Sequence, residues 1–296
     1  MRNHENLGCD LPLQQIGGAP AGEQGAVAFV RGALASLKVP QLPEVAVALA
    51  DLAARPGADL REAEVVVSRD PHVAAKIVAI ANSPTAKPGS PIRSLGSAIS
   101  RIGLPAVRDA AFLVSAETRL FRAAGYGDRM ASLCEAAQMS GLIAREVCLQ
   151  LGVDAEHAYL CGLLHDVGEA LVLSAIGELR RAKGRGAAID DADEAVALFH
   201  ADAGARACEG WGLAPEIADA VRFHHAPGGA REPSGMAGIL AVVDVLLRHI
   251  GVGGEARPLA KEGDPAFRNL RLVPEQIRRL TVSVERIALN DGAMMV

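Results

Sequence analysis

The chain has 296 residues, of which 50% are hydrophobic, and a formal net charge of −5 at pH 7. This length and apolar content allow a large buried core and exclude a disordered or fibrous protein. The negative charge gives no general attraction to the phosphates of a nucleic acid, so a nucleic-acid partner is not expected. Aromatic residues make up only 3% of the sequence. That low share favours closely packed helices over a strand-rich fold, and we expect an all-α protein.

The N-terminal stretch has no continuous apolar segment of the kind found in a signal peptide. Charged residues interrupt each later apolar stretch before it is long enough to cross a bilayer. We therefore expect a cytoplasmic protein without a membrane span. The five cysteines are scattered and form no Cys-x-x-Cys pair, which indicates neither a disulfide framework nor a thiolate zinc site.

Helical periodicity begins only after an irregular N-terminal segment. Residues 1–24 mix Gly, Pro, Gln and Asn without periodicity and are expected to form a poorly ordered arm. The first apolar helical face consists of Val45, Leu49 and Leu52, and Pro56-Gly57 then gives a stop signal. The first helices are therefore expected to be short.

Helix caps define the next elements. Asp70-Pro71 places a capping carboxylate before proline at the first helical position, and the helix should end near Asn82. The amide of Asn82 can cap this end or bridge it to the following loop. Residues 83–91 are rich in Pro, Gly and Ser and predict that loop, after which Ser94 can cap a further helix. Gly103 predicts a break between two more helices.

A second block of helices follows. The apolar spacing predicts a long helix from about Asp128 to Gly152, and Asp154 can cap a successor that runs into His165-Asp166. Helical patterns continue to about residue 250, and one more helix is expected near 274–289. We predict one domain over residues 25–250, with helical lobes over 25–122 and 123–250, and a C-terminal extension over 251–296.

Six residues of types that bind divalent metals lie in the second half of the chain: His165, Asp166, His200, His224, His225 and Asp244. An adjacent His-Asp pair on a helix points its side chains about 100° apart. Both can therefore reach one ion only where other helices bring further ligands. The alternative is that His165 and Asp166 only satisfy each other and nearby backbone groups.

The segment Gly162-Leu163-Leu164-His165-Asp166-Val167-Gly168 resembles the signature of the HD superfamily of metal-dependent phosphohydrolases. Further motifs resemble the HDOD family in order and spacing, and the likeness covers about residues 27–250. They are Leu42-Pro43-Glu44-Val45, Ser68-Arg69-Asp70-Pro71, Lys76–Ser83, Ser97–Leu104, Phe199–Gly204 and Trp211–Glu216. The resemblance implies an all-α, two-lobed helical bundle whose second lobe is of HD-superfamily type.

The resemblance also implies a regulatory output without hydrolase activity, and the sequence departs from the active enzymes in three places. Ala136 stands at the aligned position of a metal-ligating histidine, and Glu169 replaces a lysine of the cyclic-dinucleotide phosphodiesterases. The Gly-Tyr-Pro motif of those enzymes is absent after His225. The six candidate ligands are accordingly expected to form a vestigial site, with Fe, Mn, Zn or Mg as candidate ions.

Three functions remain open. The preferred hypothesis is a non-catalytic signal-transduction scaffold that binds a signalling protein such as a cyclase, kinase or regulator. The second is a divalent-metal-dependent phosphohydrolase or cyclic-dinucleotide phosphodiesterase with a rearranged site, in which Glu135 replaces the missing histidine. The third is a nucleotide sensor that uses a distant cation such as Arg108 or Arg222, although no Gly-rich phosphate loop is present.

Two features of the sequence concern the partner and the packing of the lobes. The loop over residues 83–91, with Lys87 and Arg93 as test positions, is the preferred contact region, because such loops on helical scaffolds commonly bind partners. Trp211 is expected to be a core or interdomain anchor.

Overall fold

The computed structural model describes residues 39–83, 91–183, 192–232, 235–252, 256–259 and 264–291. Throughout these ranges the regular elements are helices and no strand is present, which confirms the predicted all-α fold. The predicted N-terminal arm and residues 84–90 of the predicted contact loop, Lys87 included, lie outside the described residues.

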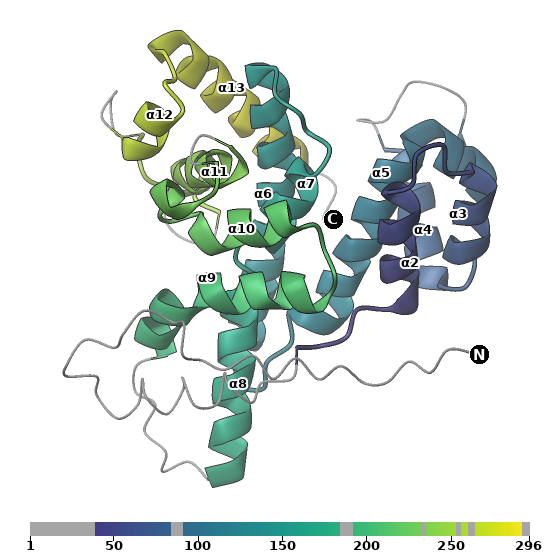
Figure 1. The fold of residues 1–296 in the computed structure, drawn as a ribbon, viewed down its shortest axis with the longest axis horizontal. Coiled ribbons are helices and arrows are strands. Elements are labelled where there is room, and N and C mark those ends of the chain that lie inside the picture. The colour runs from purple at the N-terminus through teal and green to yellow at the C-terminus, as the bar shows by residue number, and fades with distance from the viewer. Residues whose placement is uncertain are drawn as a thin grey trace.

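The helices form two lobes, with the first to the right in Figure 1 and the second to the left. The first lobe contains α2 (Glu44–Ala53), α3 (Leu60–Val67), α4 (Pro71–Ala81), α5 (Leu95–Ser115) and the π-helical turn η2 (Ala116–Leu120). The second contains α6 (Gly127–Leu151), α7 (Ala158–Leu164), α8 (Val167–Lys183), α9 (Ala192–Gly210), α10 (Pro215–Phe223), η3 (Pro227–Gly229) and α11 (Met236–Ile250). Two C-terminal helices follow, α12 (Pro265–Asn269) and α13 (Pro274–Asp291).

Local capping explains where the helices of the first lobe begin and end. The Asp70 carboxylate accepts the backbone N–H groups of the first turn of α4, and Ser94 caps α5 in the same way, as predicted. Gly103, at φ 80° and ψ 163°, interrupts α5 where the break was expected. The Asn82 amide exchanges two hydrogen bonds with the backbone of Ile92, of 2.8 and 2.9 Å, so it ties the end of α4 to the start of α5.

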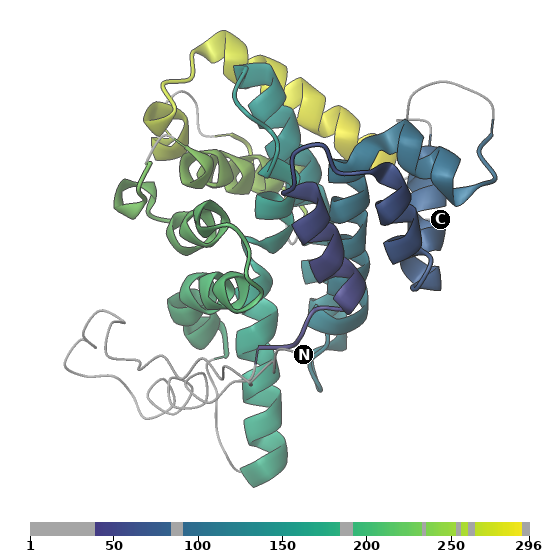
Figure 2. The same cartoon turned by 45° about the vertical axis from the view of Figure 1, so that its right-hand side comes forward.

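Two apolar clusters form the core of the described residues. The larger runs from Leu49 and Phe112 in the first lobe to Leu164 and Val221 in the second, so the lobes share one core. The smaller lies between α6, α11, α12 and α13. Figure 2 shows α13 lying along α6. The predicted C-terminal helix is therefore part of the packed body, whereas α12, which Asp264 caps, was missed.

Polar anchors add to the contact between the lobes. The buried Arg108 of α5 donates to Asp109 and to the carbonyl of Glu156, just before α7, over 2.8 and 2.7 Å. The Trp211 indole N–H donates to the Pro40 carbonyl over 2.8 Å, so it anchors the entry to the first lobe as expected. These bonds fix α5 and residue 40 against the lobe that carries the candidate site.

The expectation that charged residues interrupt every apolar stretch before it is long enough to cross a bilayer is wrong for one helical stretch of the described residues, which has the length and composition of a membrane span. It covers Ala158–Glu178, and 83% of its most apolar window is buried inside the protein. Since α7 and the first half of α8 form the centre of the second lobe, burial in the core accounts for this apolarity.

Candidate metal centre

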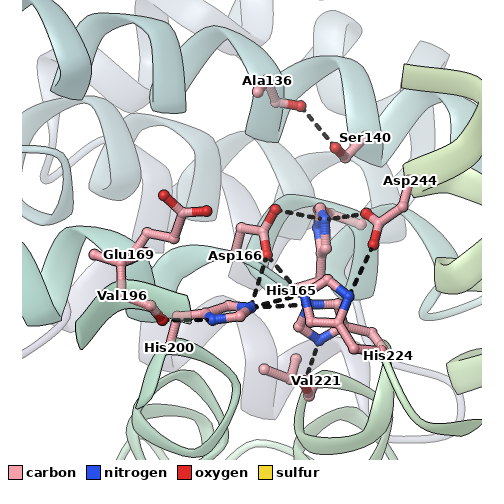
Figure 3. A network of polar contacts seen from close by, with 12 residues as sticks. Ala136, Ser140, His165, Asp166, Glu169, Val196, His200, Val221, His224 and Asp244 are labelled. Carbon is pink, nitrogen blue, oxygen red and sulfur yellow. Dashed lines mark hydrogen bonds and ion pairs between the residues drawn. The ribbon is translucent and has the colours of Figure 1, made fainter. Parts of the chain in front are cut away.

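The six predicted ligands come from four positions around the second lobe. His165 and Asp166 lie where α7 ends and α8 begins, so the expectation that one helix carries this pair is wrong. His200 is on α9, His224 and His225 follow α10, and Asp244 is on α11. Figure 3 shows five of these side chains pointing toward one another between the helices: His165, Asp166, His200, His224 and Asp244.

Asp166 lies at the middle of the cluster. Its Oδ1 is 3.2 Å from His224 Nε2 and 3.6 Å from His200 Nε2, and its Oδ2 is 3.0 Å from His165 Nε2. Asp244 extends the cluster, with Oδ1 at 3.1 Å from His165 Nε2 and Oδ2 at 3.4 Å from His225 Nδ1. The structure therefore brings together all six residues proposed from the sequence.

The backbone determines which nitrogen of each buried imidazole faces the cluster. The Nδ1 atoms lie 2.6–2.8 Å from carbonyl oxygens three or four residues earlier: His165 with Gly162, His200 with Val196 and His224 with Val221. Carbonyl oxygens only accept hydrogen bonds, so Nδ1 carries a hydrogen in each ring and Nε2 faces the cluster; a neutral ring then directs its Nε2 lone pair inward. Such second contacts orient histidines that bind metals.

Several polar atoms that face the centre of the cluster lack a favourable electrostatic partner. His200 Nε2 lies 2.9 Å from His225 Nε2 and 3.3 Å from His224 Nε2, so three imidazole nitrogens meet, and the lone pairs of His200 and His224 face each other when both rings are neutral. Asp166 Oδ1, next to them, is buried and has no hydrogen bond. Because a buried carboxylate oxygen needs a partner, this arrangement fits a cation. Satisfaction of His165 by Asp166 does not explain the three facing imidazoles.

Two overlapping sets of ligand atoms satisfy the spacing of a metal site. One comprises Asp166, His200, His224 and His225, and the other His165, Asp166 and Asp244, with the atoms of each set within 4.8 Å of one another. Asp166 belongs to both sets and directs a different oxygen to each. The residues present therefore fit a divalent ion that imidazole and carboxylate groups would hold, and Asp166 would supply a ligand atom in either set.

The metal-free cluster has an uneven distribution of charge. Burial disfavours a charged His165 ring, but Asp166 and Asp244 outweigh burial and raise its pKa well above the usual value. Burial lowers the pKa of His200, and burial together with His224 lowers the pKa of His225 to about 4. At neutral pH His200 and His225 are therefore ready to donate lone pairs, whereas His165 must lose a proton to bind an ion.

Helix α6 supplies no ligand. Ala136 lies on the side of α6 toward the cluster, and its carbonyl accepts a hydrogen bond from Ser140. Glu135, proposed as a substitute ligand, is exposed and belongs to neither set.

The arginines considered for a nucleotide sensor pair with carboxylates outside the two ligand sets. Arg108 pairs with Asp109, and Arg222 pairs with Asp202 and Glu209.

The two glycines of the His-Asp segment allow the helices to approach closely. A Cβ atom at Gly162 would lie 2.4 Å from the Ser140 carbonyl oxygen, and one at Gly168 would lie 1.8 Å from the His200 carbonyl oxygen. Gly204 faces Gly168 from α9. These glycines place α7 against α6 and α8 against α9, and so set the separation of Asp166 and His200.

The fold and the cluster define an all-α protein with an HD-type ligand set. The HDOD domain family matches residues 39–227, and the chain belongs to this family. No curated protein matches the chain significantly.

Crystal structures show the same fold. An HDOD domain protein of unknown function from Geobacter sulfurreducens has 20% identity and a TM-score of 0.69, and the match covers 90% of this chain and 96% of that one. A protein from Shewanella amazonensis SB2B, described provisionally as a metal-dependent phosphohydrolase, has 20% identity and a TM-score of 0.62, with 88% and 98% covered. A provisionally described signal transduction protein from Marinobacter aquaeolei VT8 has 23% identity and a TM-score of 0.66, with 90% of this chain and 65% of that chain covered.

Proposed function

We propose that this chain is a metal-binding signal-transduction module that acts by binding another protein and does not turn over a substrate. The observation that carries the proposal is the cluster itself, which offers ligands for a divalent ion but receives none from α6. Its imidazole-rich set favours Fe, Mn or Zn over Mg, which prefers oxygen ligands. A bound ion would supply Lewis-acid chemistry, while His165, Asp166 and the other ligands would fasten α7 through α11 together.

The surroundings of the cluster argue against phosphate hydrolysis. A phosphohydrolase stabilises the charge on the phosphate with cations near the metal. Here Glu169 follows Asp166 by one turn, and its partner Arg129 also pairs with Asp193. This ion-pair network has one cation and two carboxylates, so it offers a phosphate no unpaired positive charge.

The test combines metal content with turnover. Protein purified without chelator is analysed for Fe, Mn and Zn and assayed against cyclic dinucleotides and phosphomonoesters, alongside an Asp166→Ala variant. We expect a bound metal in the unaltered chain, little in the variant and no turnover in either. Turnover that requires Mn or Fe and disappears in the variant would overturn the non-catalytic assignment, and a metal-free unaltered chain would overturn metal binding.

A metal-dependent phosphohydrolase remains the second candidate because one side of the cluster is open. The side chain of His225 is 52% exposed and that of Asp166 is 31% exposed. A catalytic metal needs such an opening for water or substrate. The provisional description of the Shewanella relative agrees with this candidate.

The proposed partner is a cytoplasmic signalling protein, a cyclase, kinase or regulator, which contacts the first lobe or the region between lobes. Capture of partners from native cytoplasm is compared for Arg93→Glu, at an exposed position, and for the His165→Ala/Asp166→Ala double variant. We expect the first change to reduce capture. Loss of capture only in the folded double variant would instead assign partner binding to the cluster.

A further inference from the structure

An ion-pair network of Arg129, Glu169 and Asp193 borders the cluster of candidate ligands on the side of α6. Arg129, in the first turn of α6, donates to Glu169 on α8 over 3.4 Å and to Asp193 at the start of α9. The side chains of Arg129 and Glu169 are 34% and 22% exposed, whereas Asp193 is 83% exposed. The partly buried pair is thus attached to the two helices that position Asp166 and His200.

Glu169 is close to the cluster in both sequence and charge. It lies one helical turn after Asp166, and its backbone N–H donates to the Asp166 carbonyl over 2.9 Å. Burial raises the pKa of Glu169, the charge of Asp166 raises it further, and Arg129 opposes both. Figure 3 shows the Glu169 side chain beside Asp166, with its carboxylate directed away from the imidazoles.

We propose that Arg129 is a positioning residue that holds the Glu169 carboxylate away from the metal centre, and that Glu169 is a reserve ligand for a divalent ion. This inference rests on the proposed metal binding. Asp193 holds the other side of the Arg129 guanidinium, so the arginine stays in place when a divalent cation attracts Glu169. Without Arg129, the Glu169 carboxylate is free to turn toward the cation and occupy the position open to water.

The alternative is that the network of Arg129, Glu169 and Asp193 only joins α6, α8 and α9 and has no effect on a bound metal, as is true of many ion pairs in proteins. The two roles differ in what they change. A joining role affects the unfolding temperature and leaves the metal environment unaltered. A positioning role changes the affinity for the ion and the coordination around it, and it requires both partners.

The test uses Co²⁺ as the probe, because its absorption spectrum reports coordination number and ligand type. Dissociation constants from competition with a coloured chelator, Co²⁺ spectra and unfolding temperatures are measured for the full chain and four variants. These are Arg129→Gln, Arg129→Lys, Glu169→Gln and the Arg129→Gln/Glu169→Gln double variant. The matched control is Arg278→Gln, which removes an exposed Arg-Glu pair on α13.

We expect Arg129→Gln to bind Co²⁺ about tenfold more tightly, with a changed spectrum, because the released Glu169 carboxylate adds a ligand; this gain equals the lower end of the roughly 10–100-fold loss that removal of a ligand's partner causes. Arg129→Lys should remain close to the unaltered chain because it keeps the cation. The double variant should lose the gain, and neither Glu169→Gln nor Arg278→Gln should bind more tightly than the unaltered chain. Unchanged affinity and spectrum in a folded Arg129→Gln variant, or a gain that persists in the double variant, would overturn the inference. If the unaltered chain binds no Co²⁺ while remaining folded, the proposed metal binding fails and this inference fails with it.

Discussion

Substitution of Gly168 by Ala tests how the fold sets the geometry of the cluster. Gly168 is the second residue of α8 and lies two residues after Asp166. Its missing Cβ makes room for the backbone of α9, where a Cβ atom would lie 1.8 Å from the His200 carbonyl oxygen and 2.7 Å from the Gly204 nitrogen. All of these are main-chain atoms, so no side-chain rotation can relieve the overlap.

The size of the effect follows from that distance. Ordinary van der Waals contact begins at 3.4 Å, so α8 and α9 would have to separate locally by the difference from 1.8 Å, about 1.6 Å. Overpacking of this kind costs about 1–3 kcal/mol or more in folding free energy. The same displacement moves Asp166 away from His200, whose facing atoms are 3.6 Å apart. Affinity for a divalent ion should then fall by roughly 10–100-fold.

Gly210→Ala is the matched control, because Gly210 ends α9 and its added Cβ would meet no atom within 4 Å. Urea unfolding of the metal-free proteins gives the stability difference, and competition with a coloured chelator gives the metal affinity. We expect a loss of both only in Gly168→Ala. A Gly168→Ala variant as stable as the control and equal to it in metal affinity would refute the close approach of α8 and α9.

Two further predictions concern buried charge. Arg108→Met should destabilise the protein by about 3 kcal/mol in urea unfolding, because it leaves the Asp109 carboxylate buried without its main partner. The double variant Arg108→Met/Asp109→Asn should recover most of this stability. A small effect of the single change would contradict the role of Arg108 as an anchor between the lobes. In metal-free protein, the lowered pKa values of His200 and His225 mean that the unfolded chain binds more protons as the pH falls from about 6.5 towards 4. The raised pKa of His165 opposes this trend only at the upper end of the window, where the unfolded ring is still gaining its proton while the folded ring already holds one. The unfolding temperature of the unaltered chain should therefore fall as the pH is lowered through this window, and that of the His225→Gln variant should fall less. Equal falls in the two proteins would exclude His225 as a cause of the pH dependence.

Signals within a few residues predicted much of the fold. The caps at Asp70 and Ser94, the break at Gly103 and the left-handed Gly152 after α6 all lie where the sequence placed them. Each depends on one residue and its immediate neighbours. Asp264-Pro265 carries the same signal as Asp70-Pro71 and could have revealed α12, but the charged sequence around it masked the short helix.

Features that depend on contacts between distant residues were not predicted. The break between α7 and α8 was also missed, because the apolar run from Ala158 to Glu178 contains no helix stop signal at His165-Asp166. One feature that depends on distant contacts is the network around Arg129, whose partners lie 40 and 64 residues away in the sequence. Nothing in the sequence near Arg129 indicates this pairing, since it arises only when α6, α8 and α9 pack together.

The candidate ligands could be found from sequence because their orientation is decided locally, although their assembly is not. Each of the three buried imidazoles directs its Nδ1 hydrogen to a carbonyl three or four residues earlier, so its own helix sets the inward nitrogen. A short motif can therefore encode a ligand ready to bind. The glycines at 162 and 168 add the close helix contacts that bring these ligands together. The motifs also indicated the missing ligand at Ala136 and the acidic residue at Glu169, but not the pairing of Glu169 with Arg129, which forms only when α6 packs beside α8.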